Sequence, residues 1–183
     1  MNTKQPQSIL SSLFPNKAQA VAAEIAFLFI AGIFAAVVQQ YLKVPMHLPG
    51  KQGLLFMLIL TSVATLSRVK GAASITTGGA AVYLLTFQMA SGDIYKPLLY
   101  IMVGITLDAM IILWQKFNKP VLLLAVAGAL SWATIPFTRL VISSLTGVVF
   151  KSFMSGLIYP FITHLIFGFI AALIAGLAFK KYY

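Results

Sequence analysis

Residues 18–42 read AQAVAAEIAFLFIAGIFAAVVQQYL, and this stretch decides the class of the fold. Its only charged residue is Glu24. A helix needs about 20 consecutive apolar residues to cross a hydrocarbon layer about 30 Å thick. The stretch is long enough and lacks a small-residue cleavage site, so we interpret it as a retained membrane span and not as a signal peptide.

The rest of the chain has the same apolar character. Of its 183 residues, 60% are hydrophobic and 9% are charged, whereas a typical soluble domain is about 45–50% apolar and about 25% charged. This composition excludes a soluble globular domain, and the length leaves room for about six spans with short connections. The net charge of +10 comes from cations that separate apolar segments, which favours lipid headgroups over nucleic acid as their partner.

Six apolar segments lie between charges and clusters of Pro or Gly. They predict an all-α integral membrane protein, a six-transmembrane-helix bundle that forms a single domain over residues 1–183. The expected spans are residues 18–42, 53–67, 71–92, 97–115, 120–142 and 153–179. The end of the fifth span stays open, because residues 140–150 are also uncharged and either extend the helix or lie on the bundle surface.

The distribution of Lys and Arg predicts that both termini are cytoplasmic, because basic loops resist translocation. With that orientation the inner side has more of the basic residues: Lys4, Lys17, Arg68, Lys70, Lys116, Lys119, Lys180 and Lys181. The outer side has Lys43, Lys51, Lys96, Lys151 and Arg139, partly offset by Asp93.

Four ionisable residues lie within the predicted spans, where a charge costs at least about 2.5–3.5 kcal/mol on insertion scales. For Glu24, near the start of the first span, we favour a structural role at the positive end of the helix dipole. Asp108 lies deeper, where a buried partner, a pocket or a solvated inner cavity accounts for it. Arg139, in the outer part of the fifth span, either reaches the headgroups or faces a cavity. His164 is either a hydrogen-bonded core residue or part of a site.

The loop of residues 43–51, KVPMHLPGK, contains two prolines that restrict its backbone. It either presents His47 and Lys51 to a ligand or serves as an interfacial connector with its lysines among the headgroups. Met46 and His47 are both possible metal ligands, but adjacent side chains of an extended loop point to opposite sides, so we predict no metal site. Trp132, in the fifth span, either stacks on a flat ligand or packs in the core.

Small residues recur every fourth position on the first span, at Ala22 and Ala26 among others, and on the sixth span at Gly168 and Ala172. Such stripes let helices approach closely in lipid. They serve either packing within the bundle or a contact with another subunit.

The sequence lacks the metalloprotease motif H-E-x-x-H, the serine-hydrolase motif G-x-S-x-G and a Gly-rich phosphate loop. It has three acidic residues and no cysteine, which leaves little for general acid–base or metal-assisted chemistry. We therefore expect neither enzyme activity nor a cofactor.

In its size, its six predicted spans, its basic inner loops, the Ala22-xxx-Ala26 stripe and its structured first outer loop, the chain resembles the S components of energy-coupling factor (ECF) vitamin transporters. The resemblance covers the whole chain in architecture and rests on one small-residue motif. It implies a binding subunit in the plasma membrane of a prokaryote that captures a vitamin or related micronutrient from outside. It also implies a transmembrane coupling protein and two cytoplasmic ATPases as partners, with which the subunit topples in the bilayer to release its cargo.

By position, the resemblance assigns the contact with the coupling protein to Ala22 and Ala26. It assigns the substrate-binding residues to the first outer loop, as a lid, and to the outer halves of the last three spans: His47, Lys51, Trp132, Arg139 and His164. The cationic candidates and the scarcity of acids favour an anionic or flat aromatic ligand. Two alternatives stay open: a stand-alone secondary carrier with Asp108 as its proton site, and a non-transporting membrane scaffold of the rod-shape-protein type.

Overall fold

The computed structural model describes residues 16–42, 48, 50–87, 93–118, 120–154 and 156–182. Within these ranges the chain is helical and contains no strand. Its α-helices are α2 (Lys17–Tyr41), α3 (Gly53–Leu66), α4 (Ala72–Phe87), α5 (Lys96–Lys116), α6 (Val121–Thr146) and α7 (Ile158–Phe179). Two short 3-10 helices, η2 (Lys151–Phe153) and η3 (Lys180–Tyr182), precede and extend α7.

Four helices are long and apolar enough to cross a membrane: α2, α5, α6, and α7 together with η3. The other two, α3 and α4, have 14 and 16 residues. At about 1.5 Å per residue they extend over less than the hydrocarbon thickness of about 30 Å. The all-helical class and four helices of spanning length are thus confirmed, while the six-span arrangement stays a prediction.

The helix ends differ from the predicted spans at both ends of the connection between α6 and α7. The fifth predicted span continues to Thr146, where Gly147 with a φ of 73° ends α6 in the left-handed conformation. The last helix begins at Ile158 and not at residue 153, because residues 151–153 form η2 and Gly156 then takes a φ of 93°. In the third predicted span, α4 ends at Phe87, and residues 88–92 lie outside the described part of the chain.

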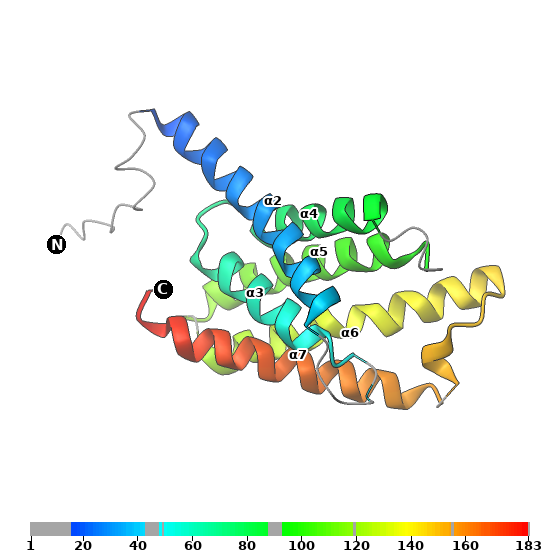
Figure 1. The fold of residues 1–183 in the computed structure, drawn as a ribbon. Helices are drawn as coiled ribbons and strands as arrows, with labels where there is room; N and C mark the ends of the chain where they lie inside the picture. The colour runs from blue at the N-terminus through cyan, green and yellow to red at the C-terminus, as the bar shows by residue number, and fades with distance from the viewer. Residues whose placement is uncertain are drawn as a thin grey trace.

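The helices form a closed ring of neighbours. Each packs on the next in the order α2, α4, α5, α6, α7 and α3, and α3 returns to α2. The contact between α6 and α7 is the most extensive, and the two helices lie along one side of the bundle, yellow and orange to red in Figure 1. The start of α2 and the end of α7 lie at the same end of the bundle (Figure 1). The cavity described below lies toward the opposite end, where α5 and α7 begin.

Glycines bring α2 and α4 into backbone contact. A Cβ atom at Gly32 of α2 would lie 1.7 Å from the carbonyl oxygen of Thr76, and one at Gly79 of α4 would lie 2.0 Å from the carbonyl oxygen of Phe29. No side chain fits in that space. This close approach is the packing that small residues allow between helices in lipid.

The small-residue stripes found in the sequence divide between two situations. Gly168 and Ala172 of α7 are buried against α6, where both contact Gly128. In contrast, Ala22 and Ala26 on the first half of α2 are exposed. The stripe on α7 therefore serves packing within the bundle, whereas the first stripe on α2 faces away from the rest of the described structure.

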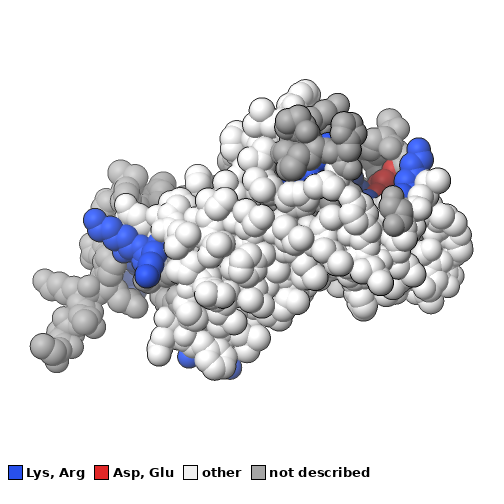
Figure 2. Space-filling view, turned by 90° about the horizontal axis from the view of Figure 1, so that it is seen from below, with Lys and Arg blue, Asp and Glu red and all other residues white. Residues whose placement is uncertain are grey.

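Charged side chains on the visible face gather toward the two ends of the molecule, and the broad middle is uncharged (Figure 2). An apolar belt between two charged ends is the surface that a bilayer requires. This distribution agrees with the helices of spanning length and marks the two ends as the parts that meet water and headgroups.

Candidate binding cavity

A cavity of about 260 Å³ lies among the end of α2, the starts of α3, α5 and α7, and the second half of α6. The structure brings together there most of the residues that the sequence singled out as substrate-binding: Lys51, Trp132, Arg139 and His164. His47 lies outside the described residues. The described part of the first loop, including Leu48, Gly50 and Lys51, forms one wall of the cavity.

Aromatic rings form a second wall. The rings of Trp132 and His164 are stacked, with centroids 5.7 Å apart and an angle of 26° between their planes. Tyr100 meets the indole edge-on at 6.1 Å, and Phe56 lies on it at 5.9 Å. Nδ1 of His164 is 2.6 Å from the carbonyl oxygen of Pro160, and only a protonated nitrogen bonds to a carbonyl. Neutral His164 therefore keeps Nε2 as a hydrogen-bond acceptor.

Two glycines let the end of the first loop and the start of α3 lie directly on these rings. Gly50 has a φ of +78°, and a Cβ atom there would lie 2.8 Å from Nδ1 of His164. A Cβ atom at Gly53 would lie 2.0 Å from Cε2 of Trp132. The indole Nε1 of Trp132 donates a hydrogen bond of 3.3 Å to the carbonyl oxygen of Gly50. Glycine at both positions thus fixes how close the loop comes to the aromatic wall.

Three cationic side chains line the cavity, Lys51 from the loop, Lys96 from the start of α5 and Arg139 from α6. None of the lining residues is acidic. Lys96 was not among the predicted site residues. The sequence signal for it is its place at the start of α5, a helix that packs on α6 and its candidate residues.

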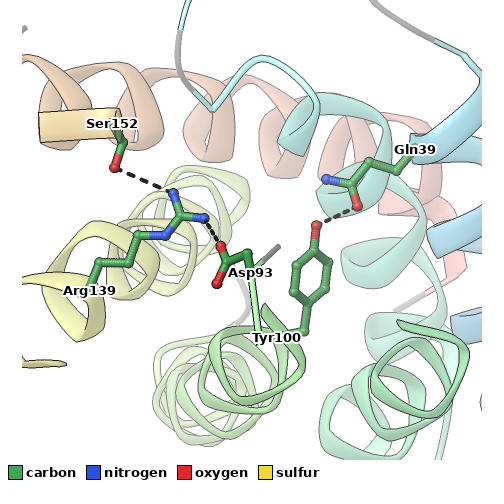
Figure 3. Close-up of polar contacts among 5 residues, drawn as sticks. All are labelled: Gln39, Asp93, Tyr100, Arg139 and Ser152. Carbon is green, nitrogen blue, oxygen red and sulfur yellow. Dashed lines mark hydrogen bonds and ion pairs between the residues drawn. The ribbon is translucent and has the colours of Figure 1, made fainter. Parts of the chain in front are cut away.

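Arg139 forms an ion pair with Asp93, with 2.7 Å between Nη2 and Oδ2. Its Nη1 donates a longer hydrogen bond of 3.5 Å to the hydroxyl of Ser152 (Figure 3). The Nε atom of Arg139 and the Oδ1 atom of Asp93 are buried, and neither has a hydrogen-bond partner among the described residues. Arg139 was expected either to reach the headgroups or to face a cavity. It faces a cavity, and its guanidinium is bound to Asp93.

A buried polar pair adds to the site. The hydroxyl of Tyr100 donates a hydrogen bond to Oε1 of Gln39 (Figure 3), and the two residues are 3% and 7% exposed. The sequence analysis missed both. The signals for them were a glutamine at the end of an apolar helix and the spacing of four between Lys96 and Tyr100, which places these two on one face of α5.

A second cavity of about 580 Å³ lies beside the first. Arg139 borders both, and Asp93, Phe150, Lys151 and Ser152 line the second. The ring centre of Phe150 is 5.4 Å from Cζ of Arg139. The ion pair between Arg139 and Asp93 therefore forms part of the boundary between the two spaces.

Asp108 lies away from both cavities and binds the start of α4. Its Oδ1 accepts a hydrogen bond of 3.0 Å from the backbone nitrogen of Ala73, and its Oδ2 accepts bonds from the backbone nitrogen of Ser74 at 2.8 Å and from the Ser74 hydroxyl at 2.5 Å. The carboxylate thus caps the N-terminus of a neighbouring helix, where it satisfies free N–H groups and faces the positive end of the helix dipole. Of the roles considered from the sequence, this arrangement matches a carboxylate with a hydrogen-bonding partner inside the bundle.

Glu24 also binds a neighbouring segment. Its Oε1 accepts hydrogen bonds from the hydroxyl of Ser67 at 2.7 Å and from the backbone nitrogen of Arg68 at 2.9 Å. These groups end α3 and begin its connection to α4. The role is structural, as expected, but the partner is this connection in addition to any effect on the dipole of α2.

Within the described ranges, no three His, Asp or Glu residues lie close enough to hold a metal ion. Comparisons with known protein families, with curated proteins and with solved structures found no match for the chain. The cavity and the surface of the bundle are therefore the features that indicate a function.

Proposed function

We propose that this chain is the substrate-binding membrane subunit of an importer of the ECF type. In this proposal the ring of six helices lies in the plasma membrane of a prokaryote with both termini in the cytoplasm, and the cavity opens to the outside. The observation that carries the proposal is the cavity at one end of an apolar bundle, lined by cations, aromatic rings and a loop built around Gly50. Few, convergent polar groups in a largely apolar pocket are typical of a small-molecule site.

The charges support this orientation. The end of the bundle opposite the cavity has these described basic residues: Lys17, Arg68, Lys70, Lys116, Lys180 and Lys181. Basic residues are enriched on the cytoplasmic side of membrane proteins. The cavity end then faces the medium from which a receptor would capture its ligand.

The exposed stripe on α2 supports a protein partner. Ala22 and Ala26 are exposed, and α2 is the least buried of the four helices of spanning length. Small side chains on an exposed helix allow the backbone of another helix to come close, which is a main source of association energy in lipid. In the proposal this face docks on the coupling protein, and two ATPases supply the energy for uptake.

The two alternatives are weaker on the same observations. A stand-alone carrier needs an ionisable group free to exchange protons, whereas the oxygens of Asp108 are engaged at the start of α4. A scaffold function does not account for a cavity that is lined by three cations and by no acid among the described residues.

Native mass spectrometry of the protein purified from its host tests the proposal. We expect a retained small molecule and co-purification of a membrane protein and two ATPases. The molecule so identified is then followed in vesicles, where we expect uptake only with the partners and ATP. Vesicles that contain this chain alone and still concentrate the solute would contradict the proposal.

The docking face is tested by the double substitution Ala22→Leu with Ala26→Leu. We expect it to abolish ATP-dependent uptake and to leave ligand binding unchanged, because the face lies far from the cavity. Gly78→Leu on α4 is the matched control, since a Cβ atom at Gly78 has no neighbour within 4 Å. Intact uptake in the double variant would show that this face is not the docking surface.

A further inference from the structure

We infer that the cavity binds a small molecule made of one planar aromatic ring that carries a carboxylate. The inference rests on the proposed function and deepens it, because it names the chemical class of the substrate. Three properties of the cavity carry it: the charge, the geometry around Arg139, and the nature and size of the walls.

The cavity has an excess of positive charge. Lys51, Lys96 and Arg139 line it, and no lining residue is acidic. The nearest described acid is Asp93, which binds Arg139 and also attracts Lys96, and a single carboxylate does not balance three cations. Cationic groups in a partly apolar, low-dielectric site are costly unless an anion balances them. A ligand with a negative charge supplies that balance, whereas a neutral or cationic ligand leaves it unmet.

The arrangement around Arg139 favours a carboxylate as the anion. The guanidinium already holds the carboxylate of Asp93, through a single contact of 2.7 Å at Nη2. Among the described residues, its Nε and the Oδ1 of Asp93 are buried and without a partner, so the two residues are joined by a single bond and not by a two-bond pair. A guanidinium binds carboxylates through two parallel hydrogen bonds. The Arg139 side chain is partly exposed and lines the cavity, and its other N–H groups offer donors to a ligand carboxylate, with Lys51 and Lys96 as additional positive charges.

The walls favour a flat ring. The stacked pair of Trp132 and His164, at 5.7 Å between centroids, and the edge-on ring of Tyr100 all border the cavity. Aromatic rings prefer offset-stacked or edge-on contacts with other rings. The volume of about 260 Å³ lies below the range of about 300–1,000 Å³ found for drug-sized ligands. It therefore accommodates one substituted ring.

Three probe molecules separate charge from ring shape. Radiolabelled benzoate is measured by equilibrium dialysis with the purified full-length chain in detergent, and unlabelled competitors are then added. Benzamide has the same ring without the charge, and cyclohexanecarboxylate has the charge without the flat ring. We expect benzoate to bind at one site and both competitors to bind at least about tenfold more weakly, which corresponds to about 1.4 kcal/mol each.

A charge variant connects the binding to this cavity. Lys51→Gln should weaken benzoate binding at least about tenfold, because it removes one of the cations that line the cavity. Lys151→Gln is the matched control, since Lys151 lies at the same end but lines the second cavity, and it should change the affinity less than about twofold. Lys51 is preferred to Arg139, whose loss would leave Asp93 unpaired and could unfold the protein.

Equal affinity for benzoate and either competitor would overturn the inference, and so would unchanged benzoate binding in Lys51→Gln. Absence of benzoate binding up to about 10 mM, weaker than about 3 kcal/mol, would also overturn it. Failure of the inference and of the proposed function are distinguishable by the native mass spectra. A retained molecule that is not an aromatic carboxylate would contradict the inference alone. The absence of any retained molecule, together with no benzoate binding, would contradict both the inference and the proposed function.

Discussion

Substitution of Asp108 tests whether this partly buried carboxylate holds the bundle together. In the structure it accepts hydrogen bonds at 3.0 Å from Ala73 N, at 2.8 Å from Ser74 N and at 2.5 Å from the Ser74 hydroxyl. Asp108→Ala leaves these donors without a partner in a partly buried place. A lost helix cap costs about 0.5–2 kcal/mol, and each buried donor left unsatisfied costs about 1–3 kcal/mol. Allowing for local relaxation, we expect a loss of about 2–4 kcal/mol in the free energy of unfolding.

Asp108→Asn is the sharper variant, because it keeps the shape and one acceptor oxygen but removes the charge. The amide nitrogen then faces backbone donors, so we expect roughly half the loss of the alanine variant, about 1–2 kcal/mol. The measurement is the midpoint of thermal unfolding in detergent by differential scanning fluorimetry. At about 2–4 °C per kcal/mol for a chain of this size, Asp108→Ala should lower the midpoint by about 5–15 °C. Thr106→Ala, a half-buried position on the same helix where the lost hydroxyl bonds only the carbonyl oxygen of Met102, should leave it unchanged.

The result that refutes this reasoning is specific. If Asp108→Asn leaves the unfolding midpoint unchanged but abolishes transport, capping α4 is not the main role of this carboxylate. It is then a proton site, and the stand-alone carrier becomes the better description of the protein.

Three further predictions concern packing and the site. Gly32→Leu should prevent α2 from packing on α4, because even a Cβ atom there would lie 1.7 Å from a backbone oxygen. We expect no recovery of folded protein on size-exclusion chromatography. Ala22→Leu, on the exposed face of α2, should leave that recovery unchanged. Gly53→Ala should displace the buried indole, whose Cε2 lies 2.0 Å from the new Cβ, and weaken ligand binding about tenfold or more in dialysis, about 1.4 kcal/mol. Arg139→Gln and Asp93→Asn should each lower the unfolding midpoint, and the double variant should recover part of the loss, with a coupling of about 1 kcal/mol.

The helices could be predicted from the sequence because hydropathy is a local property. Each predicted span overlaps one observed helix. The errors fall where uncharged residues do not distinguish helix from loop, as on either side of Lys151 in residues 140–157. The lengths of α3 and α4 were less accessible. Whether a short apolar helix spans a bilayer depends on its tilt and its neighbours, which a single segment does not encode.

Part of the candidate site could be predicted, because residues at a similar depth in neighbouring spans are expected to lie close together. Trp132 and Arg139 are seven residues apart on one helix, hence on the same face, and His164 was expected at a similar depth. The partners of the charges were not predictable. Asp93 lies in a connection far from Arg139 in sequence, and nothing local in the sequence pairs Asp108 with the start of α4, since both contacts depend on the order of helices in the ring.

The acids and the cations of this protein are used differently, and that difference links the fold to the proposed function. All three acidic residues have structural partners: Glu24 binds the end of α3, Asp108 caps α4, and Asp93 holds Arg139. A carrier driven by protons or sodium needs at least one carboxylate that changes its partner during the cycle, and these contacts leave none unengaged. Three of the cations, in contrast, line the cavity, and none of its described lining residues is acidic. A protein whose acids stabilise the fold while three cations line a cavity is suited to bind a ligand and not to energise its movement, which is why the proposal assigns the energy to partner ATPases.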